Sequence, residues 1–286
     1  MTTVLAGAAT PDMGKSQLPS IAALSMYDLP ELQAANDALW AAIRDRLAEL
    51  GVHGAPDGLT RREPVEAVWT NPDLLLAQAC GYPLVTTLAG RVRLVATPRY
   101  AAEGCEGPLR RSVMVVASGA TARTLGDLRG TRCAINDLQS DSGMNLLRAA
   151  IAPLAGGASF FQAVEVTGSH LASAHAVASG ACDLAALDCV TYAHLQRFRP
   201  ELAGRLRVLG WTDPTPGLPL ITALRTDQKT RQAMVQALDD VARDPALSEV
   251  RDVLMLEGFS ALPLSQYQAV IRLEERAAKL RYPVVC

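Results

Sequence analysis

The stretch with the clearest chemical potential is the Ser-Asp-Ser-Gly sequence at 140–143, which lies between two apolar runs. This order predicts a strand, a short polar loop and the start of a helix. At a helix start the first backbone N–H groups have no intrahelical partners, and here they would lie beside the hydroxyls of the loop. The stretch is therefore a candidate anion-binding site. The alternative is that one of its polar residues only caps a helix.

Five further polar side chains occur where the predicted elements begin, end or break. Tyr27 follows an apolar run and Asp188 ends another. Ligands of open α/β sheets bind beyond the carboxyl ends of the strands, so both side chains are candidates for one cleft. Gln78 and Tyr82 flank a Gly/Pro break and could face a cleft or the surface. His170 opens a helix, either as a ligand donor or as a solvated helix-start histidine.

The elements that must position these residues alternate between strands and helices, a pattern typical of α/β proteins. Periodicity and turn residues predict strands at 20–26, 59–62, 92–97, 113–117, 132–136, 163–167, 184–187, 206–210 and 220–224. They predict helices at 28–50, between 73 and 80, from 142 onward, and at 169–179, 189–198, 227–243, 246–256 and 265–280. Asp28 with Glu31 and Ser265 with Gln268 have the spacing of capping boxes.

The chain length of 286 residues exceeds that of a usual single domain, so two lobes are expected. We predict an α/β fold in which each lobe is a mostly parallel sheet flanked by helices and the chain crosses between the lobes twice. The predicted parts are lobe one at 19–108 and 212–286, an inserted lobe two at 109–211, and a flexible arm at 1–18.

Composition and charge exclude several classes of function. The formal net charge of -2 and the absence of a Lys/Arg cluster interleaved with aromatic residues argue against a nucleic-acid partner. No run of about 18 apolar residues occurs, so we do not expect the chain to be embedded in a membrane. The four histidines and six cysteines have no metal-ligand spacing, and no metal site is expected. A Cys80–Cys105 bridge is conceivable only if the protein is exported.

The polar motifs occur together in one order that resembles the substrate-binding proteins of phosphate, phosphite and phosphonate ABC importers. The resemblance covers roughly residues 19–280. The motifs that carry it are Tyr27-Asp28, Gln78-Ala-Cys-Gly-Tyr-Pro83, Arg111-Ser112, Leu128-Arg-Gly130, Ser140-Asp-Ser-Gly143, Gly168-Ser-His170 and Asp188. The family has the type 2 periplasmic-binding fold. The resemblance implies two lobes that close by a hinge motion around a small ligand, with no chemical step and no cofactor.

The resemblance also implies roles for individual residues. Ser140, Ser142 and Gly143 would hold the oxyanion, and Tyr27 would reach across from lobe one. His170 would be a second donor. Asp188 would pair with a ligand amine or with a protonated oxyanion, and Gln78, Tyr82, Arg111 and Ser112 complete the expected ligand-binding set.

Asp141 departs from the family pattern, which more often has a hydroxyl or a small residue at this position. A carboxylate a few ångströms from a bound phosphonate would repel it by about 1 to 4 kcal/mol, depending on the local dielectric. The sequence leaves two interpretations open. Either Asp141 points away from the ligand as a helix cap, or the ligand is not a dianion.

Two other classes of function remain open from the sequence. An enzyme on the same fold could use Cys80, His170 and Asp188, although no G-x-S-x-G, H-E-x-x-H or P-loop pattern is present. A cytoplasmic ligand sensor would differ from a transport component mainly in location and partners. The resemblance implies a periplasmic protein with an ABC permease as partner, whereas the N-terminal segment has no basic n-region or apolar h-region and favours the cytoplasm.

Overall fold

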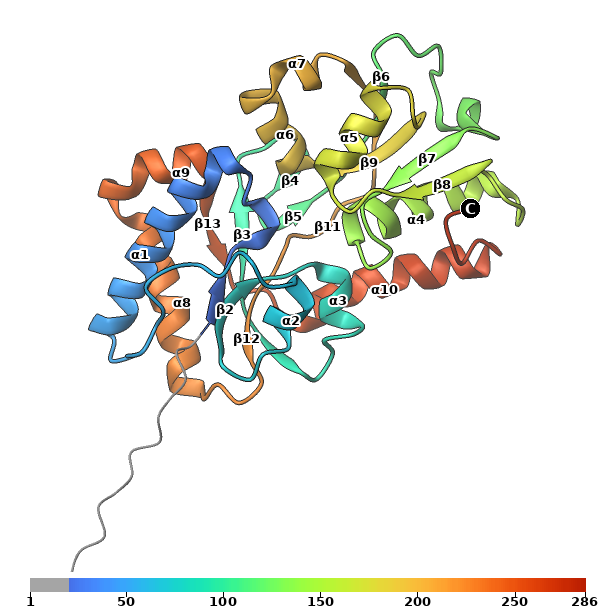
Figure 1. Ribbon diagram of the computed structural model, residues 1–286. Helices are drawn as coiled ribbons and strands as arrows, with labels where there is room; N and C mark the ends of the chain where they lie inside the picture. Colours follow the sequence, from blue (N-terminus) through green and yellow to red (C-terminus); the bar gives the residue numbers. More distant parts are fainter. Residues whose placement is uncertain (1–20) are drawn as a thin grey trace, which may run out of the picture.

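The structure is a computed structural model that describes residues 21–286. Two five-stranded sheets, each flanked by helices, form two lobes that lie side by side (Figure 1). This arrangement confirms the predicted two-lobed α/β architecture. The predicted arm at 1–18 and the first residue of the first predicted strand, Ser20, lie outside the described residues.

The lobe-one sheet has the strand order β1-β2-β12-β3-β13. The strands are β1 (Ile21–Ala23), β2 (Leu74–Gln78), β12 (Leu220–Ala223), β3 (Val92–Tyr100) and β13 (Leu256–Ser260). The helices are α1 (Gln33–Glu49), α8 (Gln228–Arg243), α9 (Ser248–Leu254), α2 (Val65–Trp69) and α3 (Gly81–Val85). The first three of these helices pack together on one side of the sheet (Figure 1).

Helix α1 shows how sequence spacing selects this packing. Its apolar residues recur every three or four positions, so they share one face. Against β2, β3, α8 and α9 this face buries Ala35, Leu39, Ile43 and Leu47, next to Leu32 of the preceding 3-10 turn. The helix ends at Glu49, and Gly51 follows with a φ of 80° that glycine adopts without strain.

Both predicted capping boxes are wrong. The Asp28 carboxylate accepts hydrogen bonds from Asn36 Nδ2 and Arg61 Nε, and a 3-10 turn separates Asp28 from α1. In α10 (Leu264–Lys279) the cap position belongs to Pro263, so Ser265 already lies inside the helix. A cap requires extended backbone directly before the first helical residue, and short motifs alone do not reveal where that residue lies.

Three predicted elements of lobe one differ in the structure. The helix predicted between 73 and 80 is the strand β2, whose five residues are all buried. A five-residue apolar run has no measurable periodicity, so it does not distinguish a buried strand from a helix. The strand predicted at 59–62 is irregular, and the end of the helix predicted at 246–256 belongs to β13.

The lobe-two sheet has the strand order β10-β6-β9-β7-β8. The strands are β10 (Leu206–Trp211), β6 (Ser112–Ala117), β9 (Leu184–Asp188), β7 (Arg132–Ile135) and β8 (Ala163–Val166). The helices are α4 (Leu146–Ala155), α5 (His170–Ala178), α6 (Cys189–Phe198) and α7 (Pro200–Ala203). The strands and helices predicted here are confirmed to within a few residues.

Strand direction is mixed in both sheets, where the sequence predicted mostly parallel strands. In lobe one, β1 and β2 are parallel, while β12 runs against both β2 and β3. In lobe two, β7 is parallel to β8 and β9, but β6 runs against β9 and β10. Strands β6 and β12 each enter their sheet from a segment that crosses between the lobes, so they run opposite to their neighbours.

The two crossing segments are joined by a small third sheet. It consists of β4 (Cys105–Glu106), β5 (Leu109–Arg110) and β11 (Thr215–Pro216) in the order β11-β5-β4. Thr215 of the returning segment lies opposite Arg110 of the outgoing one. The connection between the lobes is therefore a hydrogen-bonded sheet.

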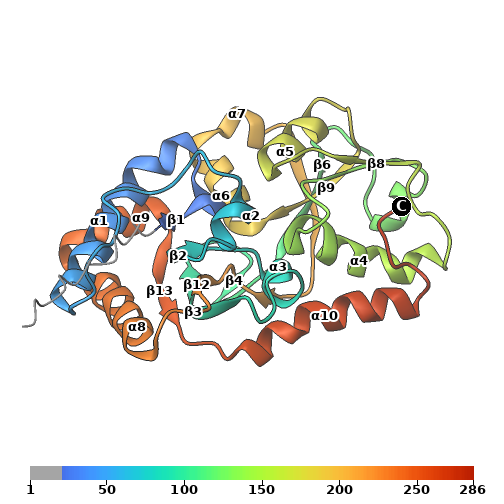
Figure 2. The same cartoon turned by 60° about the horizontal axis from the view of Figure 1, so that its bottom comes forward.

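Helix α10 forms a third link between the lobes. It starts beside lobe one and runs beneath α4 of lobe two, as Figure 2 shows. After it, the carbonyl of Cys286 accepts hydrogen bonds from the backbone N–H groups of Phe160 and Phe161 in lobe two. We propose that lobe one comprises residues 19–108 and 212–286 and that lobe two comprises residues 109–211. In this division the C-terminal residues of lobe one lie against lobe two.

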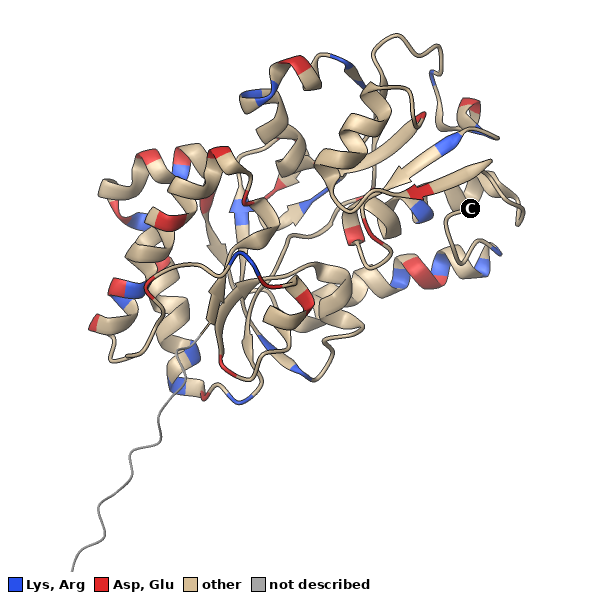
Figure 3. Cartoon of the chain, in the orientation of Figure 1, with Lys and Arg blue, Asp and Glu red and all other residues tan. Residues whose placement is uncertain are grey.

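Charged residues of both signs alternate along α1, α9 and α10 (Figure 3). The surface of these helices therefore carries both positive and negative charge, and no large area of a single sign. Within residues 21–286, no helix combines the length and the apolar character that crossing a bilayer would need.

Candidate functional site

A cavity of about 410 Å³ lies between the lobes. Lobe one contributes the segment after β1, with Tyr27 and Asp28, and the start of α3. Lobe two contributes the loop that precedes α4, the start of α5 and the start of α6. Three element starts of lobe two thus meet at one wall, which is where a sheet of this type places ligand-binding groups.

The loop before α4 positions the predicted anion-binding stretch. Its first turn, Asp141–Asn145, is a π-helical turn. Ser140 caps this turn, because its Oγ accepts a hydrogen bond from Gly143 N at 3.0 Å. The Ser142 hydroxyl lines the cavity and shares a hydrogen bond of 2.8 Å with His170 Nε2. One serine therefore serves as the helix cap, and the other faces the cavity.

Gly143 allows two groups of the cavity wall to approach the helix start. A Cβ atom at this position would overlap Asn136 Oδ1 and would lie 2.8 Å from Asn136 Cγ and 3.1 Å from His170 Cε1. Both of those side chains line the cavity. Only a residue without a side chain fits between them.

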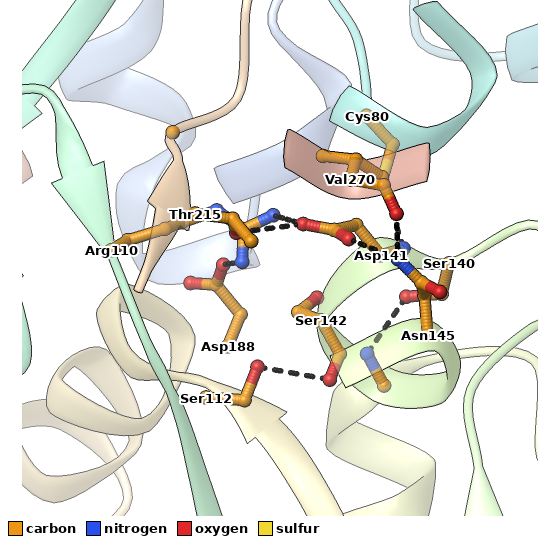
Figure 4. A network of polar contacts seen from close by, with 12 residues as sticks. Cys80, Arg110, Ser112, Ser140, Asp141, Ser142, Asn145, Asp188, Thr215 and Val270 are labelled. Carbon is orange, nitrogen blue, oxygen red and sulfur yellow. Dashed lines mark hydrogen bonds and ion pairs between the residues drawn. The ribbon is translucent and has the colours of Figure 1, made fainter. Parts of the chain in front are cut away.

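Asp141 points away from the cavity into a buried polar network. Its Oδ2 accepts from Thr215 Oγ1 at 2.9 Å, and its Oδ1 accepts from Asn145 Nδ2 at 3.0 Å. Arg110 Nη2 lies 3.6 Å from Oδ2 (Figure 4). The sequence left open that Asp141 points away from the ligand as a helix cap. The structure shows the carboxylate pointing away from the cavity, but the cap is Ser140.

Asp188 joins the two lobes behind the cavity. Its Oδ1 accepts a hydrogen bond of 2.8 Å from the Tyr27 hydroxyl of lobe one and also caps α6 through Val190 N and Thr191 N. Its Oδ2 lies 2.9 Å from Arg110 Nη1. The carboxylate is 1% exposed, so these partners replace the water that it loses on burial.

Arg110 is the main residue that sequence reasoning missed. Its side chain is 2% exposed and lies between the Asp141 and Asp188 carboxylates (Figure 4). Burial opposes its charge, but the two carboxylates outweigh burial and raise the pKa of the guanidinium. The sequence prediction named Arg111, whose Nη1 donates to the Thr212 carbonyl instead.

The remaining predicted residues support the cavity wall or lie away from it. Ser112 donates its hydroxyl to the Ser142 carbonyl and so fixes the loop from behind. Gln78 is buried in lobe one, where its amide donates to the Tyr100 hydroxyl. The Tyr82 hydroxyl donates to Glu274 of α10. The structure thus brings together Tyr27, Ser140, Ser142, Gly143, His170 and Asp188, and it separates Gln78, Tyr82 and Arg111 from them.

Cys80 lines the cavity as a thiol. Its Sγ accepts a hydrogen bond of 3.3 Å from Asp141 N, and burial raises its pKa. A nucleophilic cysteine needs a lowered pKa and a base in contact. Here His170 is bonded to Ser142, so the Cys80–His170 pair considered from the sequence does not form.

Two histidines of the cavity are neutral near pH 7. Burial lowers the pKa of His170 to about 4, and burial likewise lowers the pKa of His194 to about 4. His194 is 1% exposed and neither of its ring nitrogens has a hydrogen-bond partner. Its ring instead stacks 6.1 Å from that of Phe198.

We expect His194 to make the protein less stable in acid. Because its folded-state pKa lies below the unfolded value of about 6.5, the unfolded state binds more protons between pH 6.5 and 4, and stability falls as the pH drops through this window. Between pH 7 and pH 5 this histidine should contribute a loss of up to about 2 kcal/mol in the free energy of unfolding. Urea unfolding at both pH values measures the loss, and in His194→Leu it should shrink by that amount. An unchanged loss in the variant would contradict the assignment.

The comparisons with known proteins agree with this geometry. The family model of the phosphonate ABC transporter periplasmic substrate-binding proteins matches residues 70–267. No curated protein matches the chain.

Solved structures with the same fold come from several bacteria. A binding protein component of an ABC phosphonate transporter from Pseudomonas aeruginosa has a TM-score of 0.73 and 15% identity, over 92% of this chain and 87% of that one. PhnD1 from Prochlorococcus marinus, in complex with methylphosphonate, has a TM-score of 0.71 and 16% identity, over 91% and 99%. XAC2383 from Xanthomonas citri, bound to ATP, has a TM-score of 0.68 and 16% identity, over 92% and 98%.

At these identities the solved structures establish the fold, while the family model covers more than half of the chain and establishes the family. The chain therefore belongs to the periplasmic substrate-binding proteins of phosphonate ABC transporters.

Proposed function

We propose that this protein binds a small oxyanion-bearing ligand of the phosphonate class in the cavity between its lobes and presents it to an ABC permease from the periplasm. The observation that carries the proposal is the helix start at Ser142, whose hydroxyl lines the cavity beside His170. Helix starts attract anions through their backbone dipoles and N–H groups. The methylphosphonate complex of PhnD1 supports the same ligand class for this fold.

The charges at the cavity favour a ligand with little net negative charge. Among the lining residues that the structure describes there is no lysine or arginine, while Asp28, Glu66, Asp137 and Asp188 are all present. Asp28 and Asp188 are paired with Arg61 and Arg110, which lie outside the lining, so Glu66 and Asp137 contribute most of the negative charge. Neutral donors must then hold the oxyanion. A zwitterion such as 2-aminoethylphosphonate suits this balance better than a dianion, because its amine can approach the acidic groups.

In this proposal the two ends of the ligand have different partners. The Ser142 hydroxyl donates to the oxyanion while its Oγ accepts from His170 Nε2, and Gly143 keeps the backbone close. The ligand amine would approach the other acidic groups of the cavity, while Asp188 and Tyr27, which meet across the cleft at 2.8 Å, hold the two lobes together. Ser140 holds the helix start in shape through its bond to Gly143 N.

A hydrolytic role is the alternative that one contact favours, since Ser142 and His170 are 2.8 Å apart. A serine nucleophile needs a histidine that accepts its proton readily. Burial lowers the pKa of His170 to about 4, which makes it a weak base. We therefore propose binding without a chemical step.

We expect a thermal-shift screen of the full chain to detect binding of phosphonates, because any ligand that binds only the folded state raises the melting temperature. The panel contains methylphosphonate, 2-aminoethylphosphonate, phosphite, phosphate and sulfonates. The largest shift should come from 2-aminoethylphosphonate. In Ser142→Ala, titration calorimetry should then give a Kd about 10-fold to 100-fold higher, the usual effect of losing one hydrogen bond to a charged group.

Ser179→Ala is the matched control, because Ser179 is exposed at the end of α5 and should leave the Kd unchanged. A lack of any shift across the panel would reject the ligand class. Equal weakening in both variants would reject the assigned site.

A further inference from the structure

Two thiols lie in contact beside the cavity and have no part in the proposed ligand site. Cys105 Sγ and Cys189 Sγ are 3.5 Å apart, although the residues are 84 positions apart in the sequence. Both cysteines are reduced in the structure. The sequence had suggested Cys80 as the partner of Cys105, but Cys80 is bonded to Asp141 N.

The elements that carry the two thiols are those that hold the buried ion pair. Cys105 lies on β4 directly opposite Arg110 on β5. Cys189 follows Asp188 in the chain and begins α6. A bond between the sulfurs would therefore tie the outgoing crossing segment to lobe two at the point where Arg110 meets Asp188.

The residue before Cys105 is a glycine, which allows β4 to approach α6 closely. Gly104 has a φ of 91°, which side-chain-bearing residues rarely adopt. A Cβ at this position would lie 3.1 Å from Cys189 Cβ and 2.5 Å from Trp211 Cζ3. Glycine thus lets the β4 segment pack onto the first turn of α6.

The two thiols also differ in reactivity, as a redox pair requires. Cys105 is half-buried, and its hydrogen bond with Cys189 lowers its pKa. Cys189 is 1% exposed, and the same hydrogen bond together with burial raises its pKa. The more accessible thiol is thus the one that ionises more readily and attacks first.

We propose that Cys105 and Cys189 are a disulfide-forming pair whose oxidation fastens the crossing segment to lobe two. The oxidant is a disulfide such as oxidised glutathione. The Cys105 thiolate attacks one of its sulfurs, forms a mixed disulfide and releases one glutathione. The Cys189 thiol then loses its proton and attacks Cys105 Sγ, which releases the second glutathione. Two protein thiols are oxidised, and one glutathione disulfide is reduced to two thiols.

The family name supports the availability of such an oxidant, because it places these proteins in the periplasm, where disulfides form and persist. A disulfide sulfur pair is about 2.05 Å apart, so the two sulfurs must approach by about 1.5 Å. Strand β4 is flanked by Gly104 and Gly107, both with positive φ, so the residues on either side of it have wide backbone freedom for this shift.

Peptide mapping after incubation of the full chain with oxidised glutathione tests the proposal. Cleavage after arginine and before aspartate leaves Cys105 in the peptide 100–110 and Cys189 in 188–197, with Cys182 in a separate peptide. We expect the first two peptides to be linked. The oxidised protein should melt about 5 to 10 °C above the reduced one, because the bond closes a long loop.

Three variants make the result specific. Cys105→Ser and Cys189→Ser should each abolish the linked peptide and the gain in melting temperature. Cys182→Ser, which changes another buried thiol, should retain both. A linked peptide that involves Cys80 or Cys182, or none at all, would overturn the proposal. This test contains no phosphonate, so a negative result would not affect the proposed ligand class. A negative ligand screen would likewise not affect the proposed disulfide.

Discussion

Replacing Arg110 by methionine is expected to lower the free energy of unfolding by about 3 to 5 kcal/mol, as removal of one partner from a buried charge cluster usually does. Asp141 and Asp188 are at most 1% exposed and would lose the cation that lies between them. Methionine keeps most of the side-chain volume, so the decrease in the free energy of unfolding comes from the missing charge and not from a cavity. Urea unfolding at pH 7 gives the value.

Arg111→Met is the matched control for this prediction. The neighbouring side chain is half-buried and donates to one backbone carbonyl, that of Thr212. Its loss should cost about 1 kcal/mol, the usual net value of a single hydrogen bond. Similar losses in both variants would mean that the buried ion pairs contribute little, and the role that we assign to Arg110 would be wrong.

Gly143→Ala is expected to weaken binding of 2-aminoethylphosphonate by about 10-fold to 100-fold. The added methyl group would overlap the Asn136 side chain and crowd His170, so His170 must move and with it the Ser142 hydroxyl to which it is hydrogen-bonded. Loss of the Ser142 hydrogen bond to a charged group corresponds to about 1.5 to 3 kcal/mol. Titration calorimetry measures the change in Kd.

Gly119→Ala controls for the general effect of replacing glycine. Gly119 is exposed, and a Cβ there would meet nothing within 4 Å. This variant should bind the same phosphonate with unchanged affinity. If Gly143→Ala also binds normally, the helix start does not hold the oxyanion.

The sequence predicted lobe two well because its apolar runs are separated by clear turn residues, such as Gly168 and Gly180 on either side of α5. The helix predicted at 189–198 has these same limits in the structure, and the strand predicted at 184–187 gains one residue. In lobe one the Asn-Pro-Asp sequence at 71–73, directly before β2, also fits the start of a helix, and the five residues of β2 are all buried. Burial on both faces removes the alternation that distinguishes a strand.

The sequence also indicated which residues of the candidate site would lie close together, but only for those at the ends of elements. Ser140, Ser142, His170 and Asp188 begin or end elements, so the fold class alone places them at one edge of a sheet. Arg110 and Arg111 are adjacent on an extended segment, where neighbouring side chains point to opposite sides. The register that turns Arg110 inward comes from pairing with Thr215, about 100 residues away, and local sequence does not contain it.

Helix α10, the third link between the lobes, restricts how the lobes can move relative to each other. The two crossing segments alone would let the lobes both bend and twist. Helix α10 contacts α3 of lobe one and α4 of lobe two, so it connects the lobes a second time, to one side of the crossing segments. We therefore expect any opening of the cleft to occur mainly as rotation about a single axis, because other motions would have to slide or bend the helix. Such a constraint would make the lobes meet in the same alignment each time they close.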